Sequence, residues 1–164
     1  MREVPEYDPR AWLLKALRET AHAMESLVWN IEDSALDTRP DADEWSCRDL
    51  VAHMAHMERR YTDWLERMVR TDDAEIKAFD GDSPDPSANP DDDAFDLTDE
   101  FSVQRQQTVY LLWSLDAEDW ERRGIHPYLG PLTITQVARE MNEHDLAHLW
   151  QLRRICDRFE TASV

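Results

Sequence analysis

Apolar residues recur at alternating steps of three and four along four stretches of this chain, and this spacing constrains the fold most. In the clearest stretch the apolar positions are Leu50, Met54, Met57, Tyr61, Trp64 and Met68. Such a period gathers side chains on one face of an α-helix, whereas a half-buried strand alternates every second residue. The chain also has only 3 glycines, and it is rich in strong helix formers. The sequence therefore predicts an all-α fold.

Capping signals place the first two helices. Asp8 precedes Pro9, which is typical of an N-cap residue followed by proline at the first helical position. We expect this helix to end near Asp33. Ser46 and Asp49 form a capping box, with Asp in place of the usual Glu, at the start of a helix that reaches about residue 70.

The third and fourth helices are predicted near residues 98–115 and from Thr133 onward. Thr133 and Gln136 make a second capping box. The segment between these two helices contains the helix breakers Gly124, Pro127, Gly130 and Pro131, so we interpret it as a connector. No strand is expected anywhere in the chain.

A long acidic loop is predicted between the second and third helices, over residues 71–96. Its segment DGDSPDPSANPDDD carries three prolines, six aspartates and no basic residue. Pro84 and Asp85 occupy positions where a calcium-binding EF-hand loop needs a ligand and a glycine, so a solvated loop is favoured. Residues 1–164 are thus predicted to form one four-helix-bundle domain, connected either up-and-down or by a crossover.

The charge and apolar content limit the partners of this chain. It has 36 acidic and 18 basic residues, a formal net charge of −18, which disfavours both nucleic acid and anionic membranes as partners. No apolar stretch approaches the roughly 20 residues that span a bilayer. The first residues lack the apolar core of a signal peptide, so we expect a cytoplasmic protein. Cys47 and Cys156 are interpreted as buried, reduced thiols, although the first turn of a helix would favour a Cys47 thiolate.

Three of the six histidines are predicted to face the interior of the bundle. A helix turns about 100° per residue, so His144 and His148 share one face, and that face coincides with the apolar position Leu152. His53 lies within about 60° of the apolar stripe of the second helix. Of the others, His22 points away from the stripe of its helix, His56 lies near a flank, and His126 falls in the connector.

This inward trio favours a metal site. Burying imidazoles without partners costs a few kcal/mol each, and one divalent ion would satisfy all three. Asp145 follows His144, so the motif is not the H-E-x-x-H of zinc proteases. Imidazole ligands suit zinc, nickel and iron alike. The alternative is a hydrogen-bonded polar cluster without a metal.

Three motifs together resemble the DinB/YfiT-like family. They are WSCRDLVAH at residues 45–53, GPLT at residues 130–133 and HDLAHLWQL at residues 144–152. The resemblance covers about residues 8–158. It implies a four-helix bundle that binds a divalent metal such as nickel or zinc through His53, His144 and His148. It also implies chemistry like that of relatives that are thiol-dependent S-transferases or a mycothiol-dependent isomerase, with a low-molecular-weight thiol as a possible cofactor.

We therefore expect a metal-dependent enzyme of the thiol-transferase, isomerase or hydrolase type that acts on a small molecule. Three imidazoles leave coordination positions open, which is typical of catalytic rather than structural sites. Tyr61, Asp145 and Gln151 are candidates to support the ligands. His56 is either an outer ligand or a surface residue.

Two alternatives remain open. One is a non-catalytic protein that binds a metal or a small ligand, and the other is a structural helical dimer without a metal. Seven tryptophans are many for a chain of 164 residues, so we also expect a homodimer in which some of them cover a partner face.

Overall fold

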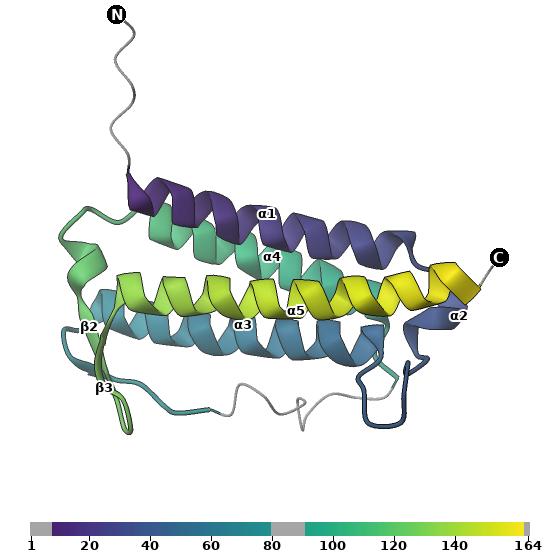
Figure 1. The fold of residues 1–164 in the computed structure, drawn as a ribbon. Helices are drawn as coiled ribbons and strands as arrows, with labels where there is room; N and C mark the ends of the chain where they lie inside the picture. The colour runs from purple at the N-terminus through teal and green to yellow at the C-terminus, as the bar shows by residue number, and fades with distance from the viewer. Residues whose placement is uncertain (1–7, 80–90, 163–164) are drawn as a thin grey trace, which may run out of the picture.

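Four long helices carry the fold of this computed structural model, which describes residues 8–79 and 91–162. They are α1 (Pro9–Asn30), α3 (Cys47–Arg70), α4 (Ala94–Trp113) and α5 (Ile134–Ala162). A one-turn helix, α2 (Asp33–Leu36), follows α1 (Figure 1). The predicted four-helix bundle is thereby confirmed.

The bundle has a crossover between its second and third long helices. Around the bundle the order is α1, α4, α3, α5, so each long helix packs against two others. The pair α3 and α4 runs parallel, because Glu58 contacts Arg105 and Thr62 contacts Thr108. The start of α4 therefore lies at the end of the bundle opposite to the end of α3 (Figure 1). By contrast, α3 and α5 run antiparallel, which brings the middle of one against the middle of the other.

Capping residues set the helix starts. The Asp8 side chain accepts a hydrogen bond from the Arg10 backbone N–H, and Ser46 with Asp49 forms the predicted capping box. Thr133 and Gln136 cap α5 reciprocally, also as predicted. The prediction was wrong at α4, which starts at Ala94 rather than near Thr98. Its N-cap residue is Asp93, which could not be distinguished as a cap in the sequence because other aspartates precede it directly.

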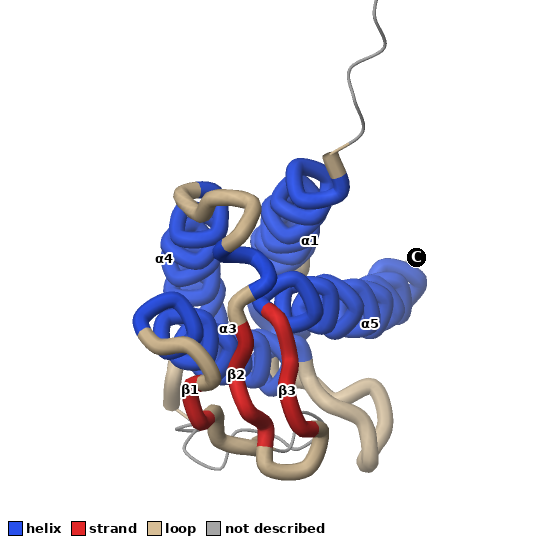
Figure 2. The backbone as a smooth tube through the Cα atoms, turned by 90° about the vertical axis from the view of Figure 1, so that its left-hand side faces the viewer, coloured by secondary structure: helices blue, strands red, loops and turns tan. Residues whose placement is uncertain are grey.

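The prediction of no strands was also wrong. A small sheet in the order β1 (Ala74–Glu75), β2 (Arg123–His126), β3 (Gly130–Thr133) closes one end of the bundle (Figure 2). The breakers in the connector form a hairpin: Gly130 has a positive φ of 76° and pairs with His126. A Cβ on Gly124 would lie 2.9 Å from Met68, so this strand packs directly on α3. These strands have two to four residues, too few to show an alternating pattern.

A 3-10 turn, η1 (Asp119–Glu121), leads into the sheet and buries Trp120. Apolar side chains from all four long helices fill the interior, among them Leu17 and Met24 of α1 and Met141 and Leu152 of α5. No helix in the described part of the chain is long and apolar enough to cross a membrane. Residues 80–90 of the predicted acidic loop lie outside the described residues, and the described start of that loop contains β1.

Candidate metal centre

The three predicted histidines meet between α3 and α5. Antiparallel packing sets His53, two turns into α3, against His144 and His148 in the middle of α5. The Nε2 atoms of His53 and His144 are 3.1 Å apart. The three ring centroids lie 4.4–5.2 Å from one another, and one nitrogen from each ring lies within 4.8 Å of the other two. The structure thus brings together side chains separated by 91 residues in the sequence.

The donor set fits a divalent transition metal. Two imidazole nitrogens bound to one ion at about 2.0–2.1 Å lie about 2.9–3.4 Å apart, for angles between octahedral and tetrahedral. The 3.1 Å between His53 and His144 falls in that range. Two Nε2 atoms that face each other need a shared proton or a cation between them, because their lone pairs repel.

The three histidines differ in their exposure to solvent. His53 is completely buried, whereas His144 and His148 are half-buried. A structural ion is enclosed by four protein ligands, whereas a catalytic ion keeps a position for water or substrate. The arrangement matches the second type.

Gln151 and Trp45 hold the ring of His148. The Nδ1 atom of His148 lies 3.0 Å from Oε1 of Gln151, one turn further along α5. An amide oxygen only accepts, so Nδ1 carries the proton and Nε2 presents a lone pair. The Trp45 indole stacks on the His148 ring at 5.9 Å with an interplanar angle of 7°. The supporting role of Gln151 stays a prediction, and this hydrogen bond is the contact through which Gln151 would act on His148.

Tyr61 lies at the other side of the trio. Its ring centroid is 6.0 Å from that of His144, and its hydroxyl donates to Oε1 of Glu140 at 3.4 Å. Burial, together with the Glu140 carboxylate, raises the pKa of this hydroxyl. Glu140 was not predicted as part of the site, although its position four residues before His144 places it on the same helical face.

Asp145 points away from the imidazoles, into the bundle. Its hydrogen-bond partners are Thr20 on α1, at 3.2 Å, and Arg105 on α4, at 2.5 and 3.1 Å. It follows His144 directly, and the 100° turn between them accounts for the different direction. Burial raises the pKa of Asp145, while Arg105 acts in the opposite direction.

The other three histidines lie apart from the trio. His22 is exposed on α1, as predicted, and His56 is half-buried on α3. His126 was expected in the connector, away from the core, but it lies at the end of β2 and is buried. Its Nδ1 accepts hydrogen bonds from the backbone N–H groups of Tyr128 and Leu129, which stabilises the turn of the hairpin. This contact of His126 was not predictable, because the hairpin itself was not predicted from the sequence.

Both cysteines are buried and neither is in a disulfide, as predicted. Burial raises the pKa of Cys47 to about 12, with Cys156 and Asp37 adding to the effect. The position of Cys47 at the helix start therefore does not produce a thiolate, because loss of solvent outweighs the helix dipole.

Comparisons with known proteins agree with this architecture. The chain is 28% identical over 154 residues to the uncharacterized protein YuaE of Bacillus subtilis, which covers 82% of this chain and 94% of YuaE. It superimposes on YfiT of Bacillus subtilis with a TM-score of 0.75 and 20% identity, over 94% of this chain and 91% of YfiT. YfiT is described as a probable metal-dependent hydrolase with an unusual four-helix bundle topology. A DinB-like protein of the same organism, YjoA, matches with a TM-score of 0.64 and 16% identity, over 90% and 91% of the chains.

The model of the DinB superfamily matches residues 16–152, a range that includes all three histidines and most of the bundle. The resemblance drawn from the three motifs is therefore confirmed, and this chain belongs to the DinB superfamily.

Proposed function

We propose that this protein is a metal-dependent enzyme that activates water or a low-molecular-weight thiol, and so acts as a hydrolase or a thiol transferase. His53, His144 and His148 would hold a zinc, nickel or iron ion. The convergence of the three imidazoles on a half-exposed side of α5 is the observation that carries this proposal. A divalent ion bound there supplies Lewis-acid activation of water or of a thiol at neutral pH.

The surrounding side chains have distinct tasks in this proposal. Gln151 fixes the tautomer and direction of His148, and Trp45 restricts the tilt of that ring. Tyr61 remains protonated, so its hydroxyl serves as a hydrogen-bond donor beside His144. The description of YfiT as a probable metal-dependent hydrolase supports the hydrolytic form, while the motif resemblance supports the thiol-dependent form.

Metal content tests the ligand assignment. Protein purified without chelators or an affinity metal should contain about one equivalent of a transition metal by elemental analysis. His148→Ala should lose most of it, because one of three bonds is removed. His22→Ala is the matched control, since His22 is exposed elsewhere on α1, and it should retain the metal. Unchanged stoichiometry in His148→Ala would contradict the assignment.

Activity assays separate the enzyme from a non-catalytic metal carrier. Metal-loaded protein should hydrolyse activated esters or amides, or accelerate the addition of a small thiol to an electrophilic carbon. The same preparation stripped of metal, and the His148→Ala variant, should lose this activity together. Activity that persists without metal would contradict the proposal.

A further inference from the structure

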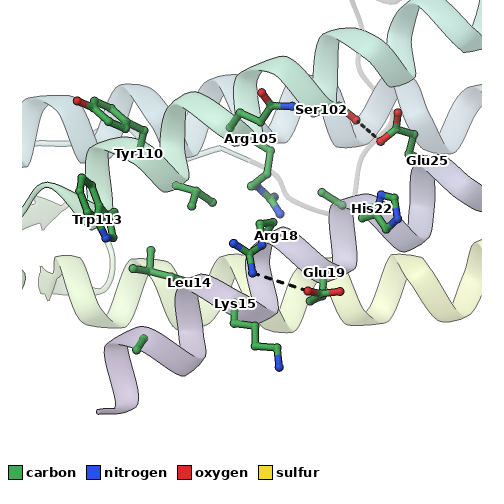
Figure 3. A pocket seen from close by; sticks show the side chains of 14 residues that line it. Leu14, Lys15, Arg18, Glu19, His22, Glu25, Ser102, Arg105, Tyr110 and Trp113 are labelled. Carbon is green, nitrogen blue, oxygen red and sulfur yellow. Dashed lines mark hydrogen bonds and ion pairs between the residues drawn. The ribbon is translucent and has the colours of Figure 1, made fainter.

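The middle of the bundle contains a buried charged cluster, which we call the arginine hub: Arg105, Glu58, Asp145, Thr20 and Thr108. Arg105 is 3% exposed, and both carboxylate residues are 1% exposed. Figure 3 shows Arg105 extending from α4 toward α1 at the base of the groove between these helices. The hub includes side chains from all four long helices.

Every N–H group of the Arg105 guanidinium has a partner. Nε and Nη2 donate to the two oxygens of Glu58 at 3.1 and 2.7 Å. Nη1 and Nη2 donate to the two oxygens of Asp145 at 2.5 and 3.1 Å. The remaining N–H on Nη1 donates to the Leu17 carbonyl of α1 at 2.9 Å. Two bidentate pairs on one planar group fix direction as well as distance.

Stability alone does not explain the hub. Burial would lower the pKa of Arg105, but Asp145 and Glu58 outweigh it and raise that pKa. Two carboxyl groups share one guanidinium in the interior, and removing ionised groups from water is costly. Well-packed apolar residues often replace such clusters without loss of stability.

The hub is connected to the metal centre through two helices. Asp145 directly follows His144 and is three residues before His148, while Glu58 lies five residues after His53. Rotating α5 by about 20° would move a group at the rim of the helix, about 5–6 Å from the axis, by about 2 Å. Metal–ligand distances tolerate only about 0.2 Å.

We propose that Arg105 is a positioning residue for the metal centre: it fixes the rotation and height of α5 relative to α3, so that the three imidazoles converge. This inference rests on the proposed function. It concerns α4, which supplies none of the three histidines, so an effect of Arg105 must pass through Asp145 and Glu58.

Cobalt(II) added to metal-stripped protein tests this inference, because its visible absorption reports coordination geometry. Arg105→Lys keeps the charge but offers three N–H donors in place of five. We expect the cobalt affinity of this variant to fall at least tenfold and its absorption spectrum to change. Both are measured at a temperature where the far-ultraviolet circular dichroism of the variant equals that of the unsubstituted protein, so that both proteins are folded. Arg59→Lys is the matched control, since Arg59 joins α3 to α4 through a surface ion pair with Glu100, and it should bind cobalt normally.

A triple variant, Glu58→Leu with Arg105→Met and Asp145→Leu, separates positioning from stability. It should fold with an undiminished melting temperature yet show the same loss of cobalt affinity. Normal cobalt binding in either the lysine or the triple variant would overturn the inference. Unfolding of both would also overturn it, because the hub would then serve the fold itself. Absence of cobalt binding in the unsubstituted protein would instead overturn the proposed metal centre.

Discussion

At the scale of single residues, two neighbouring side chains on α5 point in different directions and have different partners. His144 turns toward α3, while Asp145 turns toward Arg105 and Thr20 in the interior. The inward direction of the three histidines was predictable, because apolar neighbours define the phase of each helix. The partners of Asp145 were not, since Arg105 is a buried charge whose position the apolar pattern does not explain.

The hydrogen bond between Gln151 and His148 predicts an effect on metal affinity. Gln151→Ala removes the acceptor that fixes the Nδ1–H tautomer, so affinity should fall about 10- to 100-fold. Competition with a fluorescent chelator measures this change. Gln106→Ala, at an exposed position of α4, is the matched control and should bind metal normally. Equal affinities in the two variants would contradict the assigned role of Gln151.

The buried thiol of Cys47 predicts a dependence of stability on pH. Its pKa is about 12 in the folded protein against an ordinary 9.0, so above pH 9 the unfolded chain releases a proton that the folded chain keeps. This contribution is complete below about pH 9 and is lost as the pH rises toward 12. Between pH 8 and 10.5 the free energy of unfolding should fall by about 2 kcal/mol more in the unsubstituted protein than in Cys47→Ala. Parallel pH profiles in urea unfolding would contradict this expectation.

At the scale of helices and strands, capping chemistry was the most informative part of the sequence. Ser46 with Asp49 and Thr133 with Gln136 mark the starts of the two helices that carry the histidines. The short strands escaped prediction because they depend on packing, as Gly124 does against Met68, rather than on a local pattern. The choice of a crossover also depends on tertiary contacts, which the sequence left open.

The cap of α4 gives a prediction for this scale. The Asp93 side chain accepts hydrogen bonds from the backbone N–H groups of Phe95 and Asp96 at 2.8 and 3.2 Å. Asp93→Ala should lower the free energy of unfolding by about 1 kcal/mol, because these donors lose their partner. Asp92→Ala removes an equal charge from the exposed neighbouring position and should have a much smaller effect in the same urea titration. Similar losses in both variants would indicate that charge, not capping, matters here.

At the scale of the whole molecule, the packing of the apolar interior does not depend on the candidate metal ligands. The buried side chains of all four long helices pack without contributing ligands, apart from His53. Four of the seven tryptophans, Trp12, Trp29, Trp113 and Trp150, are exposed. The homodimer expected from tryptophan content stays a prediction, and the net charge of −18 would oppose close approach of two copies except where such apolar patches meet.

Metal removal should therefore leave the bundle folded. A chelator should strip the ion and abolish activity, while the helical circular dichroism signal keeps its amplitude and the melting temperature falls by a few degrees through loss of ligand binding. Refilling with metal should restore the activity. Collapse of the helical signal on chelation would identify a structural ion and contradict the preformed site.

The most direct test of the account is an anomalous difference map, collected at the absorption edge of the metal found in the purified protein. We expect one strong peak between α3 and α5, about 2.0–2.2 Å from nitrogens of His53, His144 and His148. A map without a peak there, or with its peak bonded to other residues, would contradict the three-histidine centre.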